Sequence, residues 1–251
     1  MKEIEEALID RRVDLAVHSM KDVPAELPQQ LTIGCIPERG DPRDVLVTNG
    51  DYKYLDDLPE EARIGTSSLR RQSQLLALRS DFKIETLRGN LDTRLKKLKS
   101  GNFDAIVLAA AGLHRMGWEG EITSYFSPDE FLPAIGQGAL GIELRKDNDD
   151  MMELIASIHD EQTAVCVRAE RSFLDRLEGG CQVPIGGYCT YDQDGRIMLT
   201  GLVGTLDGKE MYRDSITGRP EDAEQLGREL ADKLLSMGAK KILEEVYGNS
   251  C

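Results

Sequence analysis

A polar turn with the sequence Gly-Thr-Ser-Ser at residues 65–68 is followed, after one leucine, by the adjacent arginines Arg70 and Arg71. A short apolar run precedes the turn and a segment with helical character follows it. The pattern therefore predicts a helix N-terminus, where hydroxyl and backbone N–H groups can bind an anion. The two guanidinium groups would add planar, two-pronged donors that suit carboxylate or phosphate. For this turn by itself, a serine cap followed by solvated arginines is the simpler interpretation.

The charge around this turn favours the anion site. Residues 63–99 carry ten basic side chains against three acidic ones, a net charge of +7, whereas the whole chain carries −14 and the remainder therefore −21. A basic island in an acidic protein focuses a small anion. The acidic remainder would repel a long polyphosphate, and an aromatic content of 5% offers few groups for base stacking, so we expect no nucleic-acid partner. A solvated helix face explains Lys96, Lys97 and Lys99.

A second polar stretch follows a predicted buried strand at residues 13–17. Open α/β sheets bind their ligands directly after such strands. Lys21 could hold an anion there, and Asp22 could hold a cation or move a proton. A surface Lys–Asp pair before a proline turn explains the same residues equally well. His18 is interpreted as a packed, hydrogen-bonded residue, because no partner is implied by spacing.

The third candidate is Cys181, which lies in the loop Glu-Gly-Gly-Cys-Gln-Val-Pro-Ile-Gly-Gly at residues 178–187. Four glycines and a proline predict a tight, exposed loop that presents the thiol after a long helix at residues 160–177. The five cysteines are odd in number and contain no CxxC pair, which indicates neither a disulfide framework nor a zinc site. We expect no bound metal and a reducing, cytoplasmic compartment.

The elements that would position these groups alternate between strand and helix. Strands are predicted at 44–48, 63–64, 83–86 and 104–109, with a leucine-faced helix at 91–98 capped by Asn90. Such alternation predicts a parallel sheet with its ligand-facing turns at one edge. The arginines that lie in or just after these turns are Arg70, Arg71, Arg88 and Arg94. Their common placement is the strongest physical argument for a polyanionic ligand.

Two connectors, at residues 37–42 and 131–139, indicate that the chain leaves one α/β lobe for another and returns. We predict an α/β fold with two lobes of type II periplasmic-binding-protein architecture, a hinged cleft between them, and a small C-terminal α+β domain. The expected domains are 1–38 with 139–157, 43–133, and 160–251. No apolar run approaches the roughly 20 residues that cross a bilayer. We therefore expect no membrane partner. The protein is also expected to be a monomer.

Six long stretches together resemble the porphobilinogen deaminase (hydroxymethylbilane synthase) family. They are residues 17–24, 64–72, 87–94, 104–117, 133–143 and 170–188. The resemblance implies a transferase of tetrapyrrole biosynthesis that joins four porphobilinogen molecules head to tail into hydroxymethylbilane and releases ammonia. It also implies a resident dipyrromethane cofactor, held by a thioether to the cysteine that matches Cys181. Its partners would be porphobilinogen and the growing linear pyrrole chain.

The resemblance also implies roles for individual residues. Asp22 matches the catalytic aspartate, whose carboxylate can stabilise the cation left when ammonia departs and can move protons. The residues implied to bind side-chain carboxylates of cofactor and substrate are Lys21, Arg70, Arg71, Arg88, Arg94 and Arg115. The hydrogen-bonding candidates are Ser19, Thr66, Ser68, Asn90 and Gln137.

One feature of the family is missing from this sequence. The family begins with a strand and helix that contain an Ala-Thr-Arg-x-Ser-x-Leu-Ala type of segment, which contributes an arginine and a serine to the site. Because no such segment is present, we expect this chain by itself to be poorly active and marginally stable. The alternatives are a truncated, inactive homologue and a non-catalytic small-anion binding module. Asp22 and Cys181 discriminate them, since simple binding needs neither a reactive carboxylate nor an anchored thioether.

Overall fold

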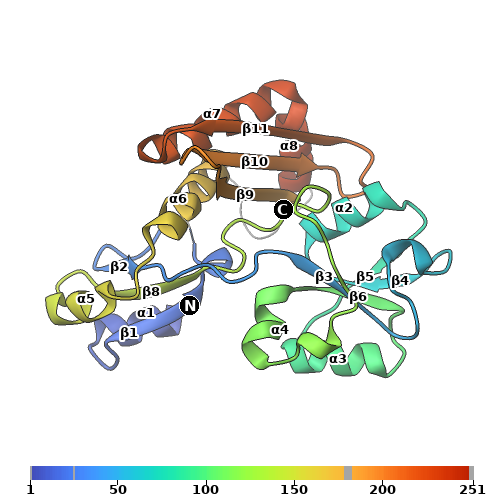
Figure 1. Ribbon diagram of the computed structural model, residues 1–251, viewed down its shortest axis with the longest axis horizontal. Coiled ribbons are helices and arrows are strands. Elements are labelled where there is room, and N and C mark those ends of the chain that lie inside the picture. The colour runs from blue at the N-terminus through green and yellow to red at the C-terminus, as the bar shows by residue number, and fades with distance from the viewer. Residues whose placement is uncertain (1, 25, 178–182, 249–251) are drawn as a thin grey trace.

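The computed structural model describes residues 2–24, 26–177 and 183–248, and the strands of this part of the chain form three separate β-sheets (Figure 1). The first sheet lies at the left of Figure 1, the second at the right, and the third above them. The two α/β sheets and the C-terminal α+β unit are the fold class that the sequence predicts.

The first sheet takes its strands from two distant parts of the chain. Its order is β1–β8–β2, and both pairings are antiparallel. Helices α1 and α5 pack against it. The elements are α1 (Lys2–Ile9), β1 (Leu15–Ser19), β2 (Leu31–Cys35), β8 (Leu140–Arg145) and α5 (Asp149–Ala156). The first strand therefore begins and ends two residues later than the predicted 13–17. A short 3-10 turn, Met20–Asp22, follows it and carries Lys21 and Asp22.

The second sheet is mixed, and the expectation of a parallel sheet was correct for only part of it. Its order is β5–β4–β6–β3–β7, with β4 parallel to β5 and β6, and β3 antiparallel to β6. The strand β3 enters from the first connector at the edge where β6 ends, so that Asp44 pairs with Ala109. The strands are β3 (Asp44–Thr48), β4 (Arg63–Gly65), β5 (Lys83–Glu85), β6 (Ala105–Ala109) and β7 (Ser124–Tyr125).

The helices of this sheet begin where the sequence predicts. Ser68 caps α2 (Leu69–Leu78) by accepting from the Arg71 N–H, and Asn90 caps α3 (Leu91–Lys99) by accepting from the Thr93 N–H. Leu95 and Leu98 are buried in the core beneath α3. A third helix, α4 (Ala110–Met116), follows β6 directly. Short 3-10 turns lie at Leu55–Asp57 and Glu119–Glu121.

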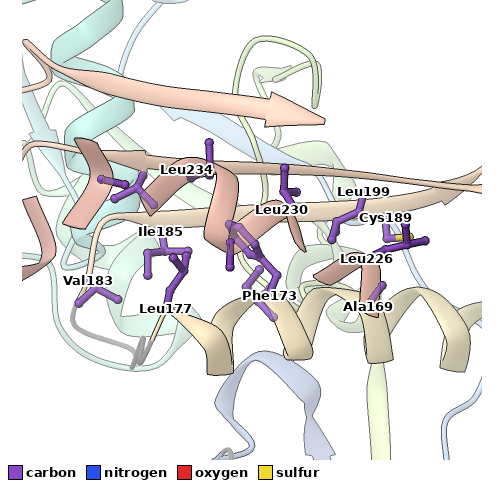
Figure 2. Close-up of a cluster of buried hydrophobic side chains, with 14 of the residues drawn as sticks. Ala169, Phe173, Leu177, Val183, Ile185, Cys189, Leu199, Leu226, Leu230 and Leu234 are labelled. Atoms are coloured by element: carbon purple, nitrogen blue, oxygen red, sulfur yellow. The ribbon is translucent and has the colours of Figure 1, made fainter. Parts of the chain in front are cut away.

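The third sheet has the antiparallel order β11–β10–β9, and α6 and α7 pack together against it. Figure 2 shows Phe173 of α6 among the apolar side chains of this core. The elements are α6 (Glu161–Arg176), β9 (Ile185–Tyr191), β10 (Ile197–Gly204), β11 (Met211–Gly218), α7 (Ala223–Leu234) and α8 (Lys240–Gly248), with a 3-10 turn at Pro220–Asp222. The C-terminal helical segment is broken within a wide turn, Leu235–Ala239, because Gly238 has a φ of 129°.

The two connectors between the α/β sheets lie against each other. The Gly40 N–H donates to the Gly138 carbonyl over 3.2 Å, and a side chain at Gly138 would stand 2.5 Å from the Gly40 carbonyl oxygen. Glu170 of α6 joins both connectors to the third sheet. Its buried carboxylate binds the Arg39 guanidinium and accepts from the N–H groups of Gly136 and Cys189 over 2.7 and 2.9 Å.

Candidate functional site

A cavity of about 270 Å³ lies where the three sheets meet. The first sheet contributes the turn after β1, and the second contributes the N-terminal parts of α2 and α3. The second connector, α6 and the start of β9 close it. The lining residues are Lys21, Asp22, Ser67, Ser68, Arg70, Arg71, Arg94, Ala134, Ile135, Gln137, Leu174, Val183 and Ile185.

Asp44 holds the two adjacent arginines from behind. It is fully buried at the start of β3, where the antiparallel entry of that strand puts it beside the turn after β6. Arg70 Nη1 donates to its Oδ2 over 2.7 Å, and Arg71 donates to its Oδ1 from Nε over 2.9 Å. Burial raises the pKa of Asp44, but the charges and hydrogen bonds of Arg70 and Arg71 outweigh it and lower the pKa to about 2.

Gln137 extends this network to the second connector. Its Nε2 donates to Asp44 Oδ1 over 3.1 Å and to the Pro42 carbonyl over 2.7 Å. Two buried polar atoms of cavity-lining residues, Arg70 Nε and Gln137 Oε1, have no hydrogen-bond partner within the described residues. A buried donor or acceptor without a partner is costly, so both atoms favour a polar ligand in the cavity.

Lys21 and Asp22 face the arginines from the opposite lobe. Burial and the charge of Arg71 lower the pKa of Lys21 from an ordinary 10.5 to about 8, and the carboxylates of Asp22 and Asp44 oppose this shift. Near neutral pH the cavity therefore gathers the cations Lys21, Arg70 and Arg71. Asp22 is exposed at the cavity, whereas Asp44 lies behind its wall.

The hydroxyls of the turn after β4 are used by the protein itself. Thr66 is buried and its Oγ1 accepts from the Ser68 N–H over 3.1 Å, while Ser68 caps α2. Ser67, which the sequence analysis did not select, lines the cavity and donates to the Leu87 carbonyl over 2.8 Å. Both serines thus combine a structural contact with a place at the cavity.

Arg94 also lines the cavity, and its Nε donates to the Gly89 carbonyl over 2.8 Å. Burial and the charge of Arg71 lower its pKa. Arg88 is exposed and Arg115 donates to the Gly138 carbonyl over 2.7 Å, and neither lines the cavity. The same holds for three further predicted residues, Ser19, Thr66 and Asn90.

The wall opposite the cations is apolar and was not predicted. It consists of Ala134 and Ile135 from the second connector, Leu174 from α6, and Val183 and Ile185 at the start of the third sheet. Isolated aliphatic residues carry no signal that separates a ligand wall from a core. Cys181 lies outside the described residues.

The basic island is more balanced than its net charge of +7 indicates, because acidic residues outside residues 63–99 approach it. Arg63 pairs with Asp104, Lys83 with Glu61, and Lys99 with Glu121, all near the surface. Arg79 and Lys96 pair with Asp81 and Asp92, which lie inside the island. Of its ten basic residues, Arg70, Arg71 and Arg94 line the cavity. The net charge of +7 therefore identifies the lobe that contributes most of the cations, whereas the positive charge that faces the cavity comes from Arg70, Arg71, Arg94 and Lys21.

Within the described ranges, no helix is long and apolar enough to cross a membrane. The same ranges hold no group of three or more His, Cys, Asp or Glu side chains that could bind a metal ion. His18, expected to be packed, is buried and its Nε2 lies 2.8 Å from Glu143 Oε2, a partner that the sequence analysis did not identify.

Two family models match the chain. Residues 1–153 match the porphobilinogen deaminase, dipyrromethane cofactor binding domain, and residues 164–236 match the porphobilinogen deaminase, C-terminal domain. Among curated proteins, the porphobilinogen deaminases of Syntrophobacter fumaroxidans and Brevibacillus brevis are 59% and 54% identical to it. In both cases the match covers 98% of this chain and 79% of the relative.

Solved structures with some similarity include solute-binding proteins of transporters. One is a probable amino-acid ABC transporter extracellular-binding protein from Bacillus subtilis, 15% identical, with a TM-score of 0.40 over 63% of this chain and 68% of that one. Another is a substrate-binding domain of a putative amino acid ABC transporter from Streptococcus pneumoniae. It is 14% identical, with a TM-score of 0.43 over 62% and 70% of the two chains.

Proposed function

The chain belongs to the porphobilinogen deaminase family, and from that membership we propose that its central cavity is where each porphobilinogen is joined to the growing pyrrole chain. The enzyme is a transferase of tetrapyrrole biosynthesis that condenses four porphobilinogen molecules into hydroxymethylbilane with release of ammonia, and its cofactor is dipyrromethane. The observation that carries the proposal is the gathering of Lys21, Arg70 and Arg71 around a cavity that also exposes Asp22.

The cavity suits a ligand that combines carboxylates with flat, apolar rings. Arg70 Nε is a buried donor without a partner within the described residues, and it would donate to a ligand carboxylate. Arg71, Arg94 and Lys21 would supply further positive charge on the same side. The aliphatic wall that includes Leu174 would pack against the pyrrole rings. The acetate and propionate groups of each pyrrole would face these cations, and the pyrrole rings would face the aliphatic side chains.

Dipyrromethane, when bound, supplies a terminal pyrrole carbon to which the next unit is added. We propose Cys181 as its attachment point, by the resemblance described above; Val183, two residues further along the chain, lines the cavity. The residues proposed to hold its carboxylates are those of the cationic wall, Lys21, Arg70, Arg71 and Arg94. Five further residues remain proposed ligand contacts although they do not line the cavity: Arg88, Arg115, Ser19, Thr66 and Asn90.

Asp22 is proposed as the catalytic carboxylate. Its position at the cavity, beside Lys21 and opposite the arginines, would let it accept hydrogen bonds from pyrrole N–H groups. As ammonia leaves the substrate, positive charge develops on the pyrrole, and a nearby carboxylate stabilises it. The same carboxylate can take the proton released when the new carbon–carbon bond forms. The cationic wall meanwhile fixes the side-chain carboxylates, so the reacting carbons are held in place.

We also propose that the protein acts as a cytoplasmic monomer with the domain limits 1–38 with 139–157, 43–133 and 160–251. The three described cysteines, Cys35, Cys166 and Cys189, are free and buried, which supports a reducing compartment. Each proposed domain contains one of the three sheets, which supports the division. Light scattering at micromolar concentration tests the monomer.

The direct test of the proposal is the intact mass of the purified protein, followed by peptide mapping and an assay with porphobilinogen. We expect two linked pyrroles on the peptide that contains Cys181, and slow but detectable formation of hydroxymethylbilane. Cys181→Ser is the matched control and should lose both the added mass and the product. A wild-type protein that carries the adduct on another residue would contradict the assignment of Cys181. A protein without adduct and without product would contradict the proposed function.

A further inference from the structure

Asp44 belongs to none of the residues that sequence or family resemblance selected. It does not line the cavity, and it is fully buried behind Arg70 and Arg71. Its carboxylate accepts from both guanidinium groups and from Gln137 Nε2. It is therefore the buried group to which three cavity-lining side chains are joined.

Resting on the function proposed above, we propose that Asp44 is a positioning residue for porphobilinogen condensation. Its carboxylate fixes the guanidinium groups of Arg70 and Arg71 at the cavity, and its negative charge offsets part of their positive charge there.

The hydrogen bonds define how the two guanidinium groups are held. Arg70 Nη1 bonds both Asp44 and the Leu132 carbonyl, each over 2.7 Å. Arg71 bonds Asp44 through Nε and Nη2, while its Nη1 donates to the Val107 carbonyl over 2.9 Å. Because Asp44 and a backbone carbonyl both accept from each guanidinium group, neither group can turn freely. Arg70 Nε is thereby left without a partner within the described residues, on a side chain that lines the cavity.

The charge balance gives Asp44 its second role. Burial lowers the pKa of Lys21 most, and the charges of Arg71 and Arg70 lower it further, whereas Asp22 beside it and Asp44 behind the arginines raise it. Arg94 of α3 adds a further cation to the same cavity. Without the carboxylate of Asp44, only Asp22 would oppose these positive charges. Lys21 would then lose its proton at lower pH, and a ligand carboxylate would lose one of its partners.

The test uses Asp44→Asn in the holoenzyme, with two readouts. The first is the pKa of Lys21, followed by the ¹³C shift of its labelled Cε and assigned with Lys21→Met. The second is the pH dependence of kcat/KM for porphobilinogen. We expect the titration of Lys21 and the basic limb of kcat/KM to move together to lower pH, by about one unit, and KM at pH 7 to rise at least about tenfold because the arginines lose their anchor. The control is Asp81→Asn, which removes the partner of Arg79 just beyond the C-terminal end of α2 and should change neither readout.

A second variant covers the case in which Asp44→Asn does not fold. Asp44→Glu keeps the charge but lengthens the side chain, so it should leave the titration of Lys21 near the wild-type value while KM rises. A folded Asp44→Asn with wild-type titration and KM would overturn the proposal, as would an Asp44→Glu with wild-type KM. The titration of Lys21 does not require turnover. A wild-type protein that makes no hydroxymethylbilane would therefore contradict the proposed function while the role of Asp44 in the charge balance was still measured.

Discussion

Two fully buried carboxylates, Asp44 and Glu170, both bind arginine, yet their surroundings differ in one respect. Glu170 faces one arginine, Arg39, and two backbone N–H groups, so that one charge is matched by one charge. Asp44 faces two arginines and one glutamine, with Lys21 close enough to feel its charge.

The difference separates structure from function. A matched and fully hydrogen-bonded pair gains nothing from a further anion, so Glu170 serves to hold the connectors and the third sheet together. The cluster around Asp44 carries more positive than negative charge, and it leaves Arg70 Nε without a partner within the described residues. An anionic ligand would supply what this cluster lacks. Removing one member of the Asp44 cluster should therefore weaken ligand binding, whereas removing one member of the Glu170 pair should destabilise the fold.

The largest expected effect is a loss of catalysis with the stability of the fold unchanged. Asp22→Asn keeps the shape of an exposed side chain and removes its charge. We expect kcat to fall by about 10²–10⁴-fold, the usual contribution of a group that transfers protons, with an unchanged unfolding midpoint. Single-turnover product formation and thermal unfolding measure the two quantities. Near-normal turnover would remove Asp22 from the mechanism.

Glu170→Gln should have the opposite profile. It leaves the Arg39 guanidinium buried without its counter-charge, and breaking a buried pair in this way costs about 3–5 kcal/mol of unfolding free energy. Because Glu170 does not line the cavity, KM for porphobilinogen should stay within about twofold, measured well below the unfolding temperature. Urea unfolding gives the free energy. A rise in KM without a loss of unfolding free energy would contradict the purely structural role of Glu170.

Arg71→Gln is the matching change on the cavity side. It removes one of two cations from Asp44 but leaves Arg70 as a partner, so the unfolding free energy should change by less than about 1.5 kcal/mol. The ligand loses a charge-assisted contact, for which a rise in KM of about 10–100-fold is expected. Steady-state kinetics and urea unfolding of the same preparation measure KM and the unfolding free energy. A variant that loses stability as Glu170→Gln does would place Asp44 and Glu170 in one class.

The effect spread over the widest range of conditions is a pH dependence with opposite signs for binding and stability. The pKa of Lys21 is lowered to about 8, so affinity for porphobilinogen should fall about tenfold as Lys21 loses its charge above that pH. Between pH 8 and 10.5 the unfolded chain binds more protons at Lys21 than the folded one. The unfolding free energy therefore gains a contribution that rises with pH in this window, by up to about 3 kcal/mol. Lys21→Met should remove both dependences.

Local signals in the sequence were sufficient for the elements and for part of the site. A serine cap at 67 or 68 and the Asn90 cap were predicted because capping depends on neighbours three residues away, and Ser68 is the serine that caps α2. Lys21 and Asp22 were selected because they follow a predicted strand of the first lobe, and the arginines of α2 because they follow one of the second, since ligands bind directly after such strands.

The partners of these residues could not be predicted in the same way. Asp44 precedes Arg70 by 26 residues and begins a strand, where an aspartate gives no sign of what it binds. Glu170 lies 131 residues from Arg39 and 34 from Gly136, and no spacing rule connects them. The antiparallel entry of β3, which brings Asp44 to the ligand edge, depends on the path of the connector. Placement in a turn selected Arg88, and family resemblance selected both Arg88 and Arg115, but neither signal indicates which side chains line a cavity of this shape.

The strand order of the first sheet also sets the order in which the chain can fold during synthesis. Its central strand, β8, lies between β1 and β2 but follows the entire second sheet in sequence, so that Leu15 pairs with Leu144. The second sheet draws all its strands from residues 44–125 and can complete its pairing before β8 leaves the ribosome. Until then β1 and β2 have no partner between them, and closing so long a loop is slow. Chaperones that shield exposed strand edges should therefore act on residues 15–35 of the nascent chain, while the second lobe is already folded.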